Sequence, residues 1–125
     1  MSNRSKTSAD NKKYNFPKSV HIIGDGCSAL SLAARANFLP HHQITVITPS
    51  NAPKVQDHIW GFWRIDGLET AESLARHKWL KWSIKTPKGN VVMTSATHGY
   101  HALRRREWET YCRKQALKHG VTFCN

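Results

Sequence analysis

The sequence has 125 residues, 39% of them apolar, which is enough for one small domain and too little for the two-domain architecture of many cofactor enzymes. Its 19 Lys and Arg outnumber 8 Asp and Glu, giving a formal net charge of +11. That charge favours an anionic partner such as nucleic acid, acidic lipid headgroups or a phosphorylated cofactor, and it does not choose among them.

Residues 1–17 are polar, carry no apolar run of the kind found in secretory signals and end at Pro17, so we expect a disordered basic tail. No stretch reaches the roughly 18 apolar residues of a membrane-spanning helix. The three cysteines, Cys27, Cys112 and Cys124, form no CxxC pair, which favours a reducing compartment. We expect the protein in the cytoplasm or on the cytoplasmic face of a membrane, where peripheral contact with acidic lipid would hold it.

A strand, a glycine turn, a helix and a second strand follow the tail. The β-rich run at 19–23 (SVHII) stops at Gly24, and the Ala- and Leu-rich stretch 28–38 (SALSLAARANF) has helical spacing and ends before Pro40. A second β-rich run, QITVIT, occupies 43–48. This order within about thirty residues predicts a βαβ unit and a parallel sheet, hence an α/β, Rossmann-like domain.

The second half alternates helical and β-rich stretches. A short helix is predicted around 68–77, and turn residues at Pro87-Lys-Gly-Asn predict a β-hairpin inserted in the domain. In the helix predicted last, Trp108, Cys112 and Ala116 are spaced four apart on one face, and Gly120 is its natural stop. The remaining predicted elements are hairpin strands at 82–86 and 91–95, a strand at 98–103, the helix at 105–118 and a strand at 121–124.

The glycine turn follows the GxGxxG pattern with alanine in the third place: Gly24, Gly26 and Ala29. The first glycine permits a tight turn, the second lets a diphosphate approach the backbone amides, and the third small residue lets the helix pack on the strand. A plain glycine turn in an unrelated βαβ unit is the alternative. The residues predicted to contact a dinucleotide diphosphate are Gly24, Asp25, Gly26, Cys27, Ser28 and Ala29.

The end of the second predicted strand lacks the acidic residue that usually binds a ribose hydroxyl. Thr48 and Ser50 stand there instead, and their hydroxyls can bond a ribose without the strength of a carboxylate. Lys54 could suit an additional phosphate. We therefore expect weaker dinucleotide binding or an altered dinucleotide preference.

A second signature lies in the last predicted helix. The spacing of Arg105, Trp108, Ala116, Gly120 and Val121 resembles the Arg-x-x-aromatic and Ala-x-x-x-Gly-Val pattern of flavoproteins with a glutathione-reductase-like FAD domain. Domains that bind only nicotinamide nucleotides lack that pattern. The resemblance implies that the nucleotide is FAD and that Arg105 comes near its phosphates.

Within that group the chain resembles the lycopene cyclases of carotenoid biosynthesis. His58-Ile-Trp60-Gly-Phe62 is similar to their His-Thr-Trp-Ser-Phe segment, and His77-Lys-Trp79 to their His-x-Trp. Tyr100 and the segment 105–108 resemble the Tyr and Arg-Phe positions that open the following helix. Each motif is modest alone, but their order matches over residues 19–125.

The resemblance implies an enzyme of the intramolecular lyase or isomerase class, with FAD kept reduced by NAD(P)H. Such enzymes cyclise the ends of lycopene with no net redox change: a proton adds to a terminal alkene, the ring closes through a carbocation, and a proton leaves. The carboxylates thought to do this acid–base work in the family lie beyond residue 125. Residues 18–125 are thus expected to be the N-terminal part of an FAD- or NAD(P)-binding domain, a fragment of the enzyme.

The stretch DHIWGFWRID at 57–66 is the candidate wall for an apolar polyene, which offers no hydrogen-bonding handles. Trp60 and Phe62 should face the same way from an extended segment, and their ring faces would attract a carbocation. Gly61 would let the substrate or the flavin approach the backbone. The alternative is that these aromatic residues only pack against the core.

Other functions fit the sequence less well. The eight histidines match no metal-ligand spacing, so no metal is expected, and Cys27 is read as a small buried residue rather than a nucleophile. A basic nucleic-acid-binding protein would leave the glycine turn unexplained, and no nucleic acid is expected. An FAD- or NAD(P)-dependent oxidoreductase or monooxygenase domain is the first alternative to a cyclase, and the basic nucleic-acid-binding protein is the second.

Overall fold

The computed structural model describes residues 17–53 and 55–125. The predicted disordered tail, apart from Pro17, and the phosphate role of Lys54 lie outside the described residues. The elements in chain order are β1 (Lys18–Ile23), α1 (Cys27–Ala33), the 3₁₀ turn η1 (Ala36–Phe38), β2 (His42–Ile47), β3 (Ile59–Trp63), α2 (Glu69–Ser73), β4 (His77–Trp79), β5 (Lys81–Thr86), β6 (Gly89–Thr94), β7 (Tyr100–Arg104), α3 (Arg105–Lys118) and β8 (Thr122–Cys124).

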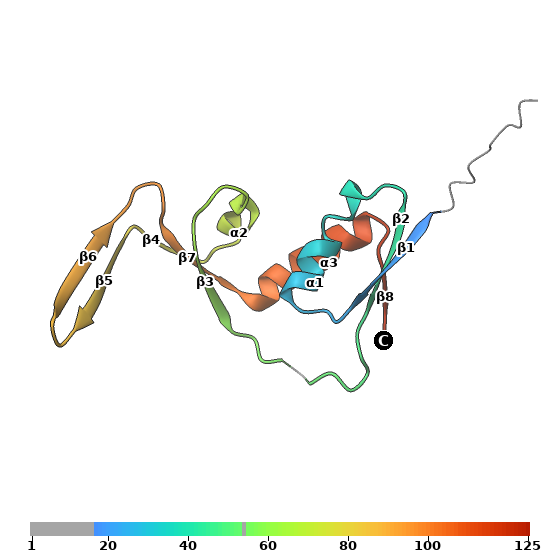
Figure 1. The fold of residues 1–125 in the computed structure, drawn as a ribbon, viewed down its shortest axis with the longest axis horizontal. Helices are drawn as coiled ribbons and strands as arrows, with labels where there is room; N and C mark the ends of the chain where they lie inside the picture. The colour runs from blue at the N-terminus through green and yellow to red at the C-terminus, as the bar shows by residue number, and fades with distance from the viewer. Residues whose placement is uncertain (1–16, 54) are drawn as a thin grey trace, which may run out of the picture.

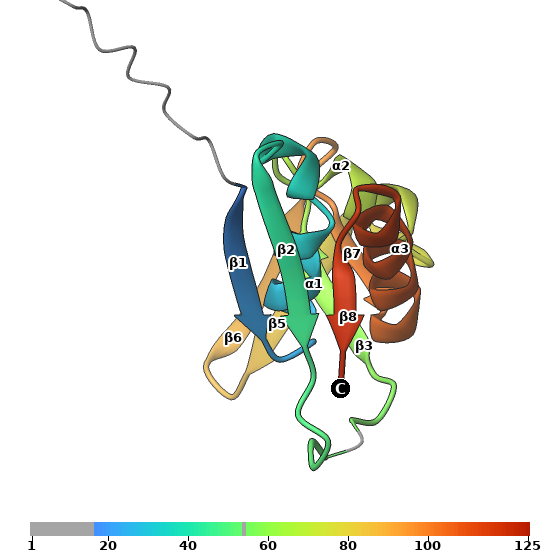
Figure 2. The ribbon, with the colours of Figure 1, turned by 90° about the vertical axis from the view of Figure 1, so that its right-hand side faces the viewer.

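The predicted parallel sheet is present, with strand order β1-β2-β8. Both α1 and α3 cover the same face of this sheet, as Figure 2 shows from the strand side. The core lies in that layer, where Ile44 and Val46 of β2 meet Ala33 and Ala116 of the helices. This confirms the α/β fold class and the apolar face of α3.

The first helix is shorter than the sequence predicted. α1 ends at Ala33, and a 3₁₀ turn over Ala36–Phe38 replaces the rest of the expected helix. Ala36 is buried against the core, so the chain must turn back toward β2 before Pro40. A 3₁₀ turn makes this tight return with i→i+3 hydrogen bonds, such as Leu39 N–H to the Ala36 carbonyl at 2.9 Å.

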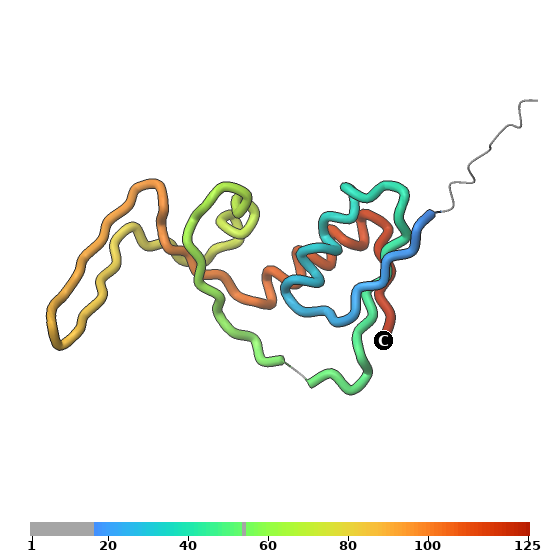
Figure 3. The backbone as a smooth tube through the Cα atoms, in the orientation of Figure 1, coloured from blue at the N-terminus to red at the C-terminus, as the bar shows by residue number. Residues whose placement is uncertain are grey.

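Between β2 and α3 the chain leaves the parallel sheet and builds an antiparallel one with strand order β3-β7-β4 (Figures 1 and 3). The predicted helix at 68–77 is wrong in its second half: α2 stops at Ser73, and His77–Trp79 is a strand. His77 pairs with Ala102 and Trp79 with Tyr100, so pairing with a strand more than twenty residues away overrides local helical preference. β7 then leads directly into α3.

The predicted β-hairpin is confirmed as β5–β6, with Thr86 opposite Gly89 across a two-residue turn. Gly89 has φ +155°, a conformation that side chains rarely adopt, so glycine suits this position. In Figure 1 the hairpin projects at the opposite end of the molecule from the parallel sheet.

Candidate functional site

The residues predicted to bind a dinucleotide gather at the carboxyl edge of the parallel sheet. The Gly24 N–H donates to the Ile47 carbonyl at 2.8 Å, which holds the glycine turn beside the end of β2. The Thr48 N–H donates to the Cys124 carbonyl at 2.8 Å, which holds Thr48 beside the end of β8. Helices packed against a parallel sheet run antiparallel to its strands, so α1 and α3 both begin at this edge. In open α/β sheets this edge is where ligands bind.

The glycine turn has the geometry that a diphosphate needs. Gly24 has φ +95°, which favours glycine and allows the sharp exit from β1. Gly26 lies at φ −72° and ψ −179°, an ordinary extended conformation, and a Cβ added there would meet no protein atom within 4 Å. The backbone conformation at position 26 therefore does not require glycine. The open space above its backbone does fit a bound group that approaches the amides.

The first amides of α1 are free to face that space. Gly26 is the N-cap, no side chain caps the helix, and the first intrahelical bond runs from the Leu30 N–H to the Gly26 carbonyl at 3.0 Å. The N–H groups of the first turn thus have no partner within the helix. Dinucleotide phosphate oxygens are suitable acceptors for them, so the residues present fit an FAD diphosphate.

Asp25 makes no capping hydrogen bond to these amides, and its carboxylate accepts instead from Nη2 of Arg113 on α3. The same guanidinium lies 4.9 Å over the centre of the Phe123 ring of β8. Arg113 therefore ties the glycine turn to α3 and β8, and it neutralises the one carboxylate within the turn. This contact could not be predicted from the sequence, since no local pattern links positions 88 apart.

Replacing Arg113 with Gln should weaken FAD binding by about tenfold, because an unneutralised Asp25 carboxylate would then repel the diphosphate or bond the α1 amides itself. The double variant Arg113→Gln with Asp25→Asn should recover most of that affinity. Titration of flavin fluorescence measures both. If the double variant binds no better than Arg113→Gln, the loss stems from the packing of Arg113 and not from the Asp25 charge.

The other residues predicted to contact the nucleotide are Thr48, Ser50 and Arg105. Thr48 is half-buried and Ser50 is exposed, both just beyond the end of β2. Arg105 opens α3 at the carboxyl edge, but its side chain is largely buried and its Nε donates to Glu109 one turn later. The Arg105 N–H bonds the His58 carbonyl at 2.9 Å. Arg105 thus fixes the start of α3 against the segment before β3, and it has an acidic partner already.

The aromatic segment forms β3, and its side chains alternate between two faces. Trp60 and Phe62 share one face as predicted: the Trp60 Nε1–H donates to His58 Nε2 at 2.7 Å, and Phe62 stacks on the buried His101 ring at 5.4 Å. Trp63 lies on the other face, where its ring contacts Tyr100 at 4.8 Å.

Tyr100 explains the glycine in this strand. A Cβ at Gly61 would lie 1.8 Å from the Tyr100 hydroxyl oxygen and 2.5 Å from its Cζ. The Tyr100 ring therefore fills the space that the missing Gly61 side chain leaves, in the manner of an aromatic residue that covers a glycine on an edge strand. On that face the Gly61 backbone is covered by protein, so the expected approach of a flavin or substrate is blocked there.

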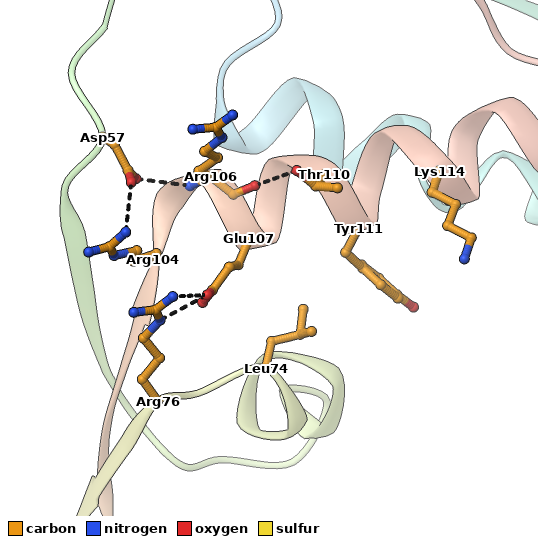
Figure 4. A pocket seen from close by; sticks show the side chains of 9 residues that line it. All are labelled: Asp57, Leu74, Arg76, Arg104, Arg106, Glu107, Thr110, Tyr111 and Lys114. Carbon is orange, nitrogen blue, oxygen red and sulfur yellow. Dashed lines mark hydrogen bonds and ion pairs between the residues drawn. The ribbon is translucent and has the colours of Figure 1, made fainter.

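Figure 4 shows a pocket of about 410 Å³ on the outer face of α3. Its acidic groups are already paired: Glu107 accepts from Arg76 at 2.6 and 2.8 Å, and Asp57 lies 3.8 Å from Arg104. A second pocket of about 330 Å³ lies where α1, α2 and α3 meet, and there the Trp108 Nε1–H donates to Ser31 Oγ at 3.0 Å. Neither pocket includes a residue predicted to bind cofactor or substrate.

Cys112 is fully buried in the α1–α3 layer, and burial raises the pKa of its thiol to about 11. Cys27 and Cys124 are exposed, so the burial expected for Cys27 is wrong. We expect two of the three thiols to react with a thiol-specific disulfide reagent at pH 8 under native conditions, and the third only after denaturation, because the thiolate is the reactive form. Rapid reaction of all three in the native protein would contradict this packing of α1 on α3.

Residues 17–53 and 55–125 contain no group of three or more His, Cys, Asp or Glu side chains placed to hold a metal ion. In the same residues no helix has both the length and the apolar character needed to cross a bilayer.

The sequence model described as "Lycopene cyclase protein" matches residues 19–125. No curated protein matches the chain.

Several solved structures share the fold. A tetrameric form of 2-methyl-3-hydroxypyridine-5-carboxylic acid oxygenase is 14% identical, with a TM-score of 0.62 over 86% of this chain and 31% of that one. The peptidyl tryptophan dihydroxylase QhpG is 15% identical, with a TM-score of 0.58 over 87% and 25%. CtdE, in complex with FAD and a substrate, is 18% identical, with a TM-score of 0.56 over 85% and 30%. The chain therefore spans less than a third of each of these proteins.

Proposed function

The chain belongs to the lycopene cyclase family, and from that membership we propose that it forms the dinucleotide-binding edge of a flavin-dependent protein that cyclises the ends of lycopene. The observation that carries the proposal is the open, uncapped glycine turn at the carboxyl edge of the parallel sheet. FAD in the similar CtdE complex supports FAD as the nucleotide. Reduction of that FAD by NAD(P)H is part of the proposal.

Each residue of the edge has a task in this proposal. The backbone amides of Cys27, Ser28 and Ala29 bind the diphosphate, while Gly24 and Gly26 keep the approach clear. Thr48 or Ser50 donates to the ribose. Arg105 adds positive charge at the start of α3, and its backbone N–H positions that helix through the His58 carbonyl. The bound flavin would supply a reduced ring system beside the substrate, and the acid–base steps would belong to the family's carboxylates, which correspond to positions after residue 125.

The substrate proposed for the neighbouring antiparallel sheet is an apolar polyene. Trp60 and Phe62 share a face of β3, and both side chains are half-buried. Ring faces stabilise a carbocation by about 0.5–2 kcal/mol through their quadrupole. In this proposal the residues orient the polyene end and stabilise the positive charge between proton addition and proton loss.

Titration of the purified chain with FAD tests the nucleotide part of the proposal directly. We expect saturable quenching of flavin fluorescence and a bound-flavin absorption spectrum, with weaker binding of NAD and NADP. Tight binding of NADP with no flavin binding would favour the nicotinamide-dependent alternative. Steeply salt-dependent binding to DNA or RNA, with no flavin spectrum, would favour the nucleic-acid alternative.

The cyclase part needs the remainder of a family member. Residues 19–125 should replace the corresponding segment of a complete lycopene cyclase with retention of ring formation, measured by chromatography of the carotenoids. In that hybrid Trp60→Ala should lower ring formation by about tenfold if the Trp60 ring faces the carbocation. Unchanged ring formation and unchanged flavin content would contradict the role of Trp60.

A flavin-dependent oxygenase is the second candidate, because two structurally similar proteins are an oxygenase and a dihydroxylase. The two reactions differ in their need for oxygen. Cyclisation returns the proton that it takes up and consumes no O₂, so ring formation in the hybrid should continue under anaerobic conditions with reduced flavin. A product that forms only with O₂ and carries a new oxygen atom would identify the oxygenase.

A further inference from the structure

The β5–β6 hairpin presents one apolar face. Its register sets Trp82 opposite Met93 and Ile84 opposite Val91, and directly opposed residues in an antiparallel pair lie on the same side. The opposite side carries mostly polar and basic residues. These are Lys81, Ser83, Lys85, Asn90, Val92 and Thr94.

The apolar face is open to solvent. Ile84, Val91 and Met93 are 53%, 55% and 48% exposed. The face continues at its base into Trp63, whose ring lies 5.3 Å from that of Trp82, around a hollow of about 220 Å³. A contiguous apolar surface of this kind marks an interaction site.

The charge of this region is one-sided. Residues 73–106 contain eight Lys and Arg and no Asp or Glu. Some of these cations are neutralised by carboxylates outside that range, as Arg76 is by Glu107. Within the part of the chain that the structure describes, Lys81, Lys85 and Lys88 of the hairpin make no ion pair.

We propose that the β5–β6 hairpin docks on the surface of an anionic lipid bilayer. Its apolar face enters the boundary between headgroups and acyl chains, and its lysines reach lipid phosphates along their flexible stems. Trp63 and Trp82 lie at the base of that face, and tryptophan favours this interfacial depth. A neutral apolar partner would leave the three lysines unpaired, whereas lipid phosphates would pair with them. An anionic surface therefore fits best. The inference goes beyond the proposed function, since docking depends on neither flavin nor cyclisation.

Vesicle flotation with the full chain tests the proposal. At about 0.1 M salt, where screening acts over roughly 10 Å, the chain should float with vesicles of equal phosphatidylcholine and phosphatidylglycerol and not with phosphatidylcholine alone. Replacing Lys81, Lys85 and Lys88 with Gln should weaken vesicle binding by about 100-fold, because each lysine strengthens binding by a factor of about ten or less. The matched control replaces Lys18, Lys114 and Lys118, which are exposed and lie outside the hairpin, and should lose less than about tenfold. Equal losses in the two triple variants would overturn the proposal.

Ile84→Asp tests the apolar face separately. Because Ile84 is 53% exposed, the variant should unfold at the same urea concentration as the parent, yet it should bind anionic vesicles at least about tenfold more weakly. Tryptophan emission of the parent should shift to the blue on binding, and brominated lipid should quench it. Unaltered binding of Ile84→Asp would overturn the proposal. So would a lipid-free dimer that this substitution dissociates, because the face would then be a contact between copies of the chain.

Discussion

Gly26→Val should abolish measurable FAD binding while leaving the fold intact. The valine side chain would occupy the space above the first amides of α1, where no protein atom lies within 4 Å of the Cβ position. Loss of two charge-assisted hydrogen bonds to the diphosphate corresponds to about 3 kcal/mol or more, a factor of at least roughly 100 in Kd. Because Gly26 has an ordinary extended conformation, the free energy of unfolding should fall by less than about 1 kcal/mol, as expected for an unfavourable N-cap residue.

Gly24→Val is the matched control, since the opposite outcome is expected at a position only two residues earlier. Gly24 has φ +95°, so a side chain strains the backbone whatever space surrounds it. The free energy of unfolding should fall by about 1–3 kcal/mol, measured by urea denaturation without ligand. If Gly26→Val bound FAD normally, or if its only effect were destabilisation like that of Gly24→Val, the diphosphate would not lie on this turn.

Local patterns predicted those elements whose boundaries are set by a few neighbouring residues. The helix at 105–118 was predicted with its observed bounds, because Gly120 follows it and its apolar residues keep one face. The β5–β6 hairpin was predicted because Pro87 and Gly89 dictate its turn. The gathering of the glycine turn and Thr48 at one edge follows from the βαβ order itself.

The features that sequence analysis missed depend on contacts between distant residues. His77–Trp79 is a strand because β7 pairs with it, although LETAESLARH has helical composition. The Asp25–Arg113 ion pair joins positions 88 apart. Gly61 was expected to expose backbone to a ligand, and the ring that instead covers it comes from Tyr100 on the next strand. A glycine marks a close approach, but its sequence context does not say which group approaches.

Gly61→Ala should destabilise the protein, although alanine normally suits a strand better than glycine. The new Cβ would lie 1.8 Å from the Tyr100 hydroxyl oxygen, and that ring is wedged against Trp63 at 4.8 Å and near Trp79 at 6.2 Å. Forcing the ring aside is an overpacking change that costs about 1–3 kcal/mol in the free energy of unfolding. Gly26→Ala, which meets no neighbour at an ordinary φ, is the control for alanine substitution as such.

A double-mutant cycle with Tyr100→Val distinguishes the effect of this contact from a general intolerance of β3 to a side chain at position 61. Without the tyrosine ring, Gly61→Ala should be neutral or stabilising by about 0.5–1 kcal/mol, because alanine loses less backbone freedom on folding than glycine. The sign of the Gly61→Ala effect should therefore reverse between the two backgrounds, with a coupling energy of about 1–3 kcal/mol from urea denaturation. An equal loss in both backgrounds would mean that Gly61 is needed for a backbone reason unrelated to Tyr100. Reversal would establish that the two strands are locked together by the aromatic ring on the face of β3 opposite Trp60 and Phe62, so that those two side chains keep their orientation on the proposed substrate face.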